Sequence, residues 1–365
     1  MAVPFRIGVM QLTMEPVADI LDHARQLDRN GFDTIWLAEA YPWWRKHSME
    51  ARSSTALSPL IAQATSRLAV GWGIISPYTR HPIQVAMDAR VMLEMTADGS
   101  GRDRFLLGYG ASKIFMRHIG AGERGPARPL TAISDSLRIV RAVLGGGPVE
   151  YDGEEFSAHL PPLSPDANAP PASVPLYVAG TGPRLQEMAG QMADGLLTPS
   201  ITTPGFVRYA RENLRRGARQ AGRDADDIDL GCTIVASIDD DPDRGRQGAR
   251  EIAAMYLANK VQNIRGSADV LLQEAGLSMD EIVPVADAME RGGRLAAADA
   301  VTDRILDKCR PIAGSPRECV ERIQEYRDAG CTHVMLELWG DRRSEQIELF
   351  GAKVLPELAA MSETR

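Results

Sequence analysis

The sequence is poor in cysteine, in paired histidines and in long apolar runs, and each shortage excludes a class of protein. Its four cysteines form no CxxC pair and have no histidine at zinc-ligand spacing, so neither a disulfide framework nor a metal site is expected. The six histidines form no HxH or ExxH pair, which argues against a metal-dependent hydrolase. No run approaches the roughly 18 apolar residues of a membrane span. The cysteines are Cys232, Cys309, Cys319 and Cys331.

Aromatic residues make up only 5% of the 365 residues, whereas 44% are hydrophobic and 25% charged, which is typical of a globular protein with a sizeable core. The net charge of −8 and the pI near 5.4 disfavour nucleic acid as a partner and favour a small molecule. The N-terminal MAVPFRIGVMQL lacks the basic flank and cleavage site of a signal peptide. It reads as a first strand, and a cytoplasmic location is expected.

Eight segments read as strands that are buried on both faces of a parallel sheet, with helical patterns between them. Residues 16–31 illustrate the plan, because apolar residues recur at helical spacing, Gly31 ends the helix and a strand follows at once. Residues 315–338 repeat it, with Ser315 as N-cap, Pro316 at N1 and Glu318 at N3. The eight strand segments are 5–11, 33–39, 68–75, 104–110, 175–180, 195–199, 228–238 and 332–338.

Eight alternating units over this length favour one closed α/β domain, a (β/α)8 TIM barrel spanning residues 1–365. An open doubly wound sheet is the main alternative, but the turn after its first strand would carry GxGxxG, and here that turn is QLTMEP. Residues 146–175 interrupt the repeat with a hairpin turning at Asp152-Gly153 and a proline-rich run. Residues 239–310, between strands seven and eight, predict a helical insertion, which is either a lid or a bundle covering one side.

The chemistry of such a barrel lies where its strands end, and unusual residues gather there. In GTGPR, after the fifth strand, Gly180 and Gly182 permit close backbone approach, Thr181 offers a hydroxyl and Pro183 opens a helix, an arrangement that suits a phosphate. A plain turn capped by Thr181 explains the same residues. The glycines of GYGAS, after the fourth strand, predict a bare backbone surface for a flat ring, or only a tight turn.

The third-strand motif GIISPYTRHP at 73–82 is the most specific, and Ala179 to Pro183 and AGQMADGLL at 189–197 accompany it. These motifs together resemble the bacterial luciferase-like superfamily, in the branch that uses the deazaflavin coenzyme F420. Methylenetetrahydromethanopterin reductase and F420-dependent glucose-6-phosphate dehydrogenase belong to that branch. The resemblance implies an oxidoreductase that transfers a hydride between coenzyme F420 and an organic substrate, and a homo-oligomer, a dimer.

The resemblance further implies a bulge with a cis Gly73-Ile74 peptide behind the middle ring of the coenzyme. Glu39 matches an acidic residue of the family. The residues that the resemblance places around the coenzyme are Glu39, Gly73, Ile74, Ser76, Gly108, Gly110, Ala111, Ala179, Gly180, Thr181, Gly182, Pro183 and Thr198.

One departure concerns the acid–base pair. The sugar-phosphate dehydrogenases carry a histidine after the acidic residue and a glutamate beyond the fourth-strand glycines, where this chain has Ala40 and Lys113. Glu39 and Lys113 are therefore the catalytic candidates. Other rim residues read as substrate contacts or ordinary polarity and packing: Gln11, Tyr41, Trp43 and Trp44.

Arg80 and His81 read better as an ion-paired arginine and a helix start than as catalytic groups. Two alternative functions stay open. One is an FMN-dependent monooxygenase on the same barrel, and the other is an F420-binding protein without turnover, which the missing acid–base pair favours.

Overall fold

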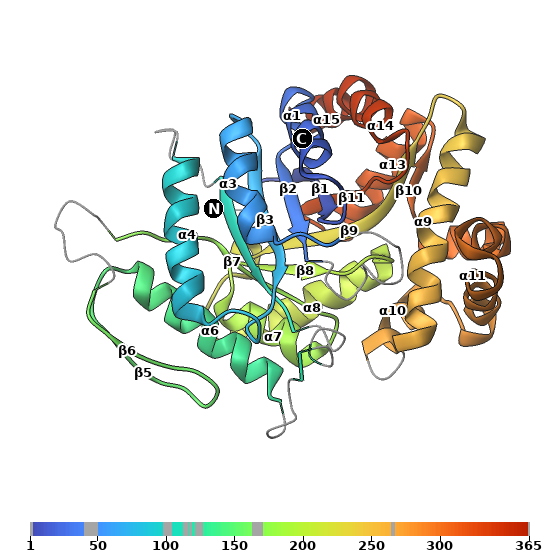
Figure 1. Ribbon diagram of the computed structural model, residues 1–365. Coiled ribbons are helices and arrows are strands. Elements are labelled where there is room, and N and C mark those ends of the chain that lie inside the picture. The colour runs from blue at the N-terminus through green and yellow to red at the C-terminus, as the bar shows by residue number, and fades with distance from the viewer. Residues whose placement is uncertain are drawn as a thin grey trace.

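The computed structural model describes residues 3–39, 50–97, 104–111, 116, 119–120, 127–162, 171–263 and 267–363. Its centre is a closed barrel of eight parallel strands, so the expected (β/α)8 fold is confirmed (Figure 1). All eight expected strands are present, and pairing of β8 with β9 closes the ring. The barrel strands are β1 (Arg6–Leu12), β2 (Thr34–Ala38), β3 (Ala69–Ile75), β4 (Phe105–Tyr109), β7 (Leu176–Ala179), β8 (Gly195–Thr198), β9 (Asp229–Ile238) and β11 (His333–Glu337).

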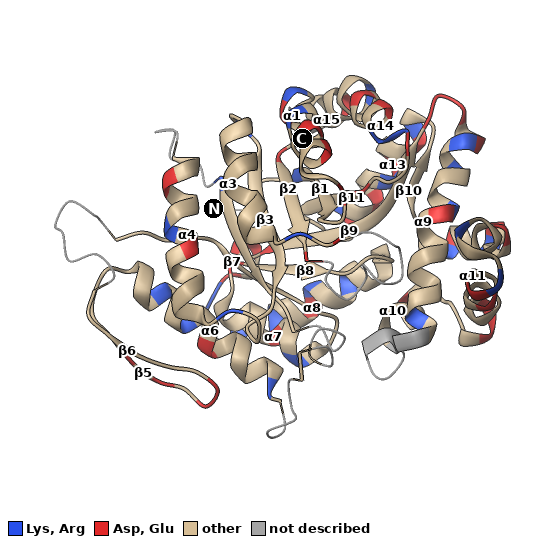
Figure 2. Ribbon diagram, viewed as in Figure 1, with Lys and Arg blue, Asp and Glu red and all other residues tan. Residues whose placement is uncertain are grey.

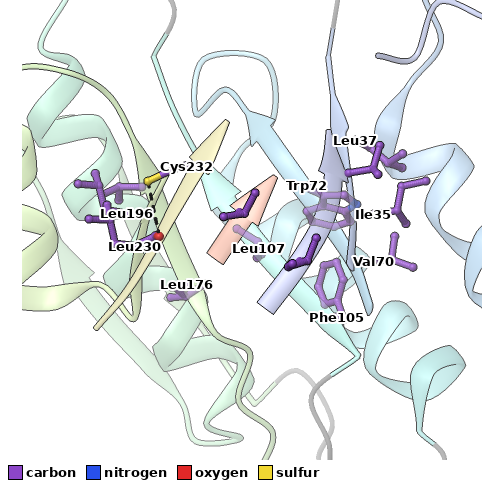
Figure 3. Packing of buried hydrophobic residues seen from close by; sticks show 14 of the residues in the cluster. Ile35, Leu37, Val70, Trp72, Phe105, Leu107, Leu176, Leu196, Leu230 and Cys232 are labelled. Carbon is purple, nitrogen blue, oxygen red and sulfur yellow. Dashed lines mark hydrogen bonds between the residues drawn. The ribbon is translucent and has the colours of Figure 1, made fainter. Parts of the chain in front are cut away.

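Helices surround the barrel, and the outward side chains of the strands pack against them. Figure 3 shows this packing for Trp72 and Phe105, whose rings meet edge to face with centroids 4.7 Å apart. The Nε1 of Trp72 donates to the Oγ of Ser58 at 2.7 Å, so the buried indole is satisfied. The covering helices are α1 (Val17–Arg29), α3 (Ser54–Ala64), α4 (Pro82–Thr96), α6 (Pro129–Leu144), α7 (Pro183–Met192), α8 (Pro204–Gln220), α13 (Pro316–Asp328), α14 (Arg343–Leu349) and α15 (Leu355–Glu363).

The structure contains the helix-ending glycine and the helix-capping residues that the sequence predicts. Gly31 has φ 85°, the left-handed conformation that a residue with a Cβ seldom adopts. Ser315 and Glu318 form the expected capping box at the start of α13, with Pro316 in the first turn. Short helical segments complete this part of the chain: η2 (Ala225–Asp227), and the π-helix η3 (Phe350–Val354).

A polar cluster closes the N-terminal end of the barrel. Arg6 pairs with Asp229, while the hydroxyl of Tyr177 donates to that carboxylate at 2.8 Å and a ring nitrogen of His333 lies 3.2 Å from it. Burial opposes ionisation of Asp229, but hydrogen bonding from His333 and the charge of Arg6 hold its pKa below the ordinary value. These polar side chains fill the described part of this end of the barrel.

Two excursions leave the repeat. Strands β5 (Val149–Asp152) and β6 (Ser157–Leu160) form an antiparallel hairpin, on the opposite side of Figure 1 from helices α9 to α11. Residues 242–309 hold four helices, α9 (Pro242–Asn263), α10 (Ser267–Ala275), α11 (Met279–Ala300) and α12 (Asp303–Cys309). A short strand that the sequence did not predict, β10 (Ile312–Gly314), follows them and pairs in parallel with β9.

Charges of both signs mix over the outer helices, while the barrel strands carry few (Figure 2). None of the described helices combines the length and apolarity needed to cross a bilayer. All four cysteines are buried and free, as expected. The described residues contain no group of three or more histidine, cysteine, aspartate or glutamate side chains that could hold a metal.

Candidate active site

The C-terminal mouth of the barrel has an apolar floor. The inner cluster Met10, Trp36, Leu106, Tyr177, Leu197 and Met335 fills the barrel, and Ala38, Ile74 and Ala179 pack on top of it. These three residues are only half-buried, although most residues of their strands are fully buried. An inward-facing, partly exposed apolar surface at strand ends is the kind of surface on which a flat ring can lie.

A bulge in β3 creates part of this floor. Gly73 pairs with Gly108 and Ile75 with Tyr109, so Ile74 is the extra residue on the bulged strand. The Gly73-Ile74 peptide is cis, as the resemblance implied. Because of the extra residue, the side chain of Ile74 joins the inner cluster.

Gly108 in β4 and Gly110 directly after it lie close to β3. A Cβ on Gly110 would lie 2.8 Å from the Cγ1 of Ile74, and one on Gly108 would lie 2.5 Å from the backbone oxygen of Trp72. Ile74 thus lies against the Cβ side of both glycines, and a bare backbone surface that receives a flat ring stays a prediction. The two glycines permit the close approach of β3, and Ala111 follows them half-buried at the rim.

Glu39, at the end of β2, is held by an arginine. Its two carboxylate oxygens accept from Arg80 at 2.7 and 3.0 Å, and Ser54 Oγ donates to it at 3.1 Å. His81 caps α4 by accepting from the backbone nitrogen of Ile83 at 3.3 Å. The ordinary roles expected for Arg80 and His81 are thus the observed ones, and a proton-relay role for Glu39 requires this ion pair to open.

The GTGPR loop leaves the start of α7 open. Gly182 is the N-cap with φ −75°, Pro183 is the first helical residue and no described side chain caps the helix. Thr181 is nearly buried and makes no cap bond, so the plain capped turn is not observed. Uncapped amide hydrogens and the positive end of the ten-residue α7 are suited to an anion such as phosphate.

Three further predicted residues serve local structure. Ser76 Oγ accepts from the backbone nitrogen of Tyr78 at 3.3 Å, and the hydroxyl of Thr198 accepts from Thr202 at 2.7 Å. The amide of Gln11 donates to Leu12 O at 2.8 Å and to a carboxylate at 2.9 Å. Ala40, Tyr41, Trp43, Trp44 and Lys113 lie outside the described residues.

The sequence did not single out Glu337, the last residue of β11, which lies at the same rim. The residue is 1% exposed, and Tyr256 of α9 donates a hydrogen bond to its Oε1. Burial raises the pKa of Glu337 to about 7 against the lowering effects of the hydrogen bond from Tyr256 and of the nearby Ser200 hydroxyl. The available signal was an acidic residue at an inward position of the strand THVMLEL.

A parallel barrel with an apolar floor, an uncapped helix start and a buried acid at one rim has the features of a cofactor-dependent barrel enzyme. The profile of the family described as Luciferase-like monooxygenase matches residues 1–333. The chain belongs to this family, and its relatives are oxidoreductases.

Several relatives align over nearly their whole length. The chain is 28% identical over 342 residues to the 5,10-methylenetetrahydromethanopterin reductase of Archaeoglobus fulgidus, covering 92% of this chain and 94% of that one. It is 25% identical to the F420-dependent glucose-6-phosphate dehydrogenase of Nakamurella multipartita, covering 94% and 93%. The solved F420-dependent tetrahydromethanopterin reductase of Methanopyrus kandleri superimposes with a TM-score of 0.83 at 26% identity, covering 97% and 99%.

Proposed function

We propose that this chain is an F420-dependent oxidoreductase that transfers a hydride between the deazaflavin and a small organic substrate. The observation that supports the proposal is the rim of the barrel, where Ile74 forms part of an apolar floor and α7 begins without a side-chain cap. The F420-dependent relatives, matched over more than nine-tenths of the chain, support the choice of coenzyme.

The residues present fit the coenzyme. Ala38, Ile74 and Ala179 would carry the face of the ring, and the first-turn amides of α7 beyond Gly182 would receive the phosphate. When bound, the deazaflavin supplies the carbon that accepts or gives the hydride. The protein orients the substrate over the ring, excludes water and handles a proton. We propose that Ser76 and Thr198 also border this space.

Gly182→Ala tests the phosphate position without disturbing the fold. Nothing lies within 4 Å of a Cβ at Gly182, and its φ of −75° suits any residue, so stability should stay unchanged. The methyl group would project at the helix start and should weaken coenzyme F420 binding about tenfold or more, the effect of losing one charge-assisted hydrogen bond. Gly147→Ala is the matched control, because a Cβ there also meets open space.

Titration of the protein with coenzyme F420 and with FMN, read by visible absorbance, decides between the cofactors. We expect the protein to bind F420. Gly182→Ala should weaken this binding, whereas Gly147→Ala should leave it unchanged. Tight FMN binding without F420 binding would move the chain to the monooxygenase alternative. F420 binding with no reduction by any alcohol, sugar phosphate or amine would leave a coenzyme-binding protein.

We also propose a homodimer in the cytoplasm. Four apolar side chains are exposed on neighbouring helices: Leu60 of α3, and Met87, Val91 and Met95 of α4, at 38–51%. An apolar stripe of this kind on the outside of a barrel is suited to association with a second copy. Light scattering after gel filtration tests it, with Val91→Glu expected to shift the mass to that of a monomer.

A further inference from the structure

We propose that Glu337, held by Tyr256, is the residue that exchanges the proton with the substrate. The inference rests on the proposed hydride transfer, since that reaction moves a proton as well. Glu337 lies on the last strand of the barrel, 298 residues after Glu39 in the sequence (337 − 39).

Strand alternation places Glu337 inside the barrel. Val334 and Leu336 pack outward into the main core, while Met335 packs inward with Trp36 and Tyr177. Glu337 is the next inward position and lies opposite Val235 on β9. Its carboxyl therefore belongs to the layer directly above the filled interior, the layer of the apolar floor.

The carboxyl has one oxygen without a partner. Oε1 accepts from Tyr256, but Oε2 is buried and has no hydrogen-bond partner among the described residues. The hydroxyl of Ser200, after β8, lies near enough to lower the pKa without reaching hydrogen-bond geometry. A buried polar atom without a partner costs free energy, and a substrate hydroxyl or carbonyl would satisfy it.

The other acidic side chains discussed at the described rim form ion pairs with arginines. Glu39 pairs with Arg80 and Glu15 with Arg343. Asp239 pairs with two further arginines, Arg244 and Arg342. Glu337 has no ion pair with any described residue, so it is the rim acid whose proton is available.

Among the described residues, the groups that influence the pKa of Glu337 are the hydroxyls of Tyr256 and Ser200. Tyr256 comes from α9 and Ser200 from the segment after β8, and burial raises the pKa of Tyr256 well above its ordinary value, so it remains a donor. With its own pKa near 7, Glu337 holds and releases a proton near neutral pH, which is the optimum for general acid–base catalysis.

Oxidation of an alcohol substrate removes one proton and one hydride. The substrate O–H bond breaks and an O–H bond forms on the Glu337 carboxylate, while the electron pair of the adjacent C–H bond leaves as hydride to the deazaflavin. The substrate is oxidised to a carbonyl, and the reverse reaction returns the proton from Glu337.

The experiment compares wild type with Glu337→Gln, Tyr256→Phe and the exposed control Glu357→Gln. The protonated-carboxyl band in infrared spectra is titrated between about pH 5 and pH 9 in the absence of coenzyme. Wild type minus Glu337→Gln isolates this group from Asp33, whose pKa is also raised by burial. Tyr256→Phe should move the midpoint to higher pH, because the lost hydrogen bond favoured the ionised form.

Turnover with coenzyme F420 is the second readout. Glu337→Gln should bind F420 normally but lose about 10²-fold or more in kcat and lose the pH limb near 7. A carboxyl already ionised at about pH 5, or a Glu337→Gln variant with wild-type kcat and pH profile, overturns the assignment. Failure of F420 binding in wild type would instead sink the proposed function, and the infrared midpoint would still report the proton on Glu337.

Discussion

Replacing Glu337 by glutamine should remove a large part of the pH dependence of folding stability. The unfolded chain releases this proton near its ordinary pKa of 4.5, whereas the native chain holds it to about 7. Between these values the native state binds more protons, so the free energy of unfolding falls as pH rises. The stabilisation is complete below the unfolded pKa and is lost as pH passes the folded pKa.

The difference between 4.5 and about 7 corresponds to about 3 kcal/mol at about 1.4 kcal/mol per pKa unit. The side chain is 1% exposed, so solvent screening does not reduce this figure much. Glutamine keeps the size and the acceptor for Tyr256 but does not titrate. The stability of wild type relative to Glu337→Gln should therefore drop by about 3 kcal/mol between about pH 4 and pH 8.

Urea unfolding at a series of pH values, followed by fluorescence of the buried Trp36 and Trp72, measures this difference. Every other titrating group is shared by the two proteins, so its contribution cancels. Parallel stability curves for the two proteins across this interval would refute the reasoning, because they would mean that Glu337 ionises in the native state as easily as in the unfolded one.

Two other substitutions test the rim. Arg80→Met should destabilise the fold by about 2–4 kcal/mol, because Glu39 loses its charged partner where its side chain is only 10% exposed, and urea unfolding measures it. The exposed pair of Arg317 provides the control, and an Arg80→Met loss as small as that of Arg317→Met would contradict the reading. Gly110→Val should cost about 1–3 kcal/mol and weaken F420 binding, since its Cβ meets Ile74 at 2.8 Å; unchanged binding would remove Ile74 from the coenzyme floor.

The fold could be predicted because each barrel strand carries its own signal. A run such as LAVGWGII is apolar throughout because helices cover one face and the barrel interior the other. β10 was missed because three residues, Ile312–Gly314, are too few for any periodicity. The apolar run of β11 predicted a buried strand, but it did not predict a role for Glu337, because an acidic residue within an apolar run gives no indication of its partner.

The site depends on contacts between distant segments, which composition and spacing do not report. The ion pair of Glu39 with Arg80 joins the ends of β2 and β3 across 41 residues. Whether the glycines of β4 are bare or covered depends on where the bulge turns Ile74, a matter of register between two strands. Sequence patterns thus predicted where the rim lies. Which of its side chains form ion pairs or hydrogen bonds depends on contacts between distant segments of the chain.

The most direct test of coenzyme binding at this rim is a titration of the purified protein with coenzyme F420, followed at its visible absorbance, in wild type and Gly182→Ala. Saturable binding at one site per chain is expected, weakened about tenfold or more by Gly182→Ala while the thermal midpoint of unfolding stays unchanged. Absence of F420 binding in a folded wild-type protein, or equal affinity in both proteins, would contradict a coenzyme held between the Ile74 floor and the start of α7.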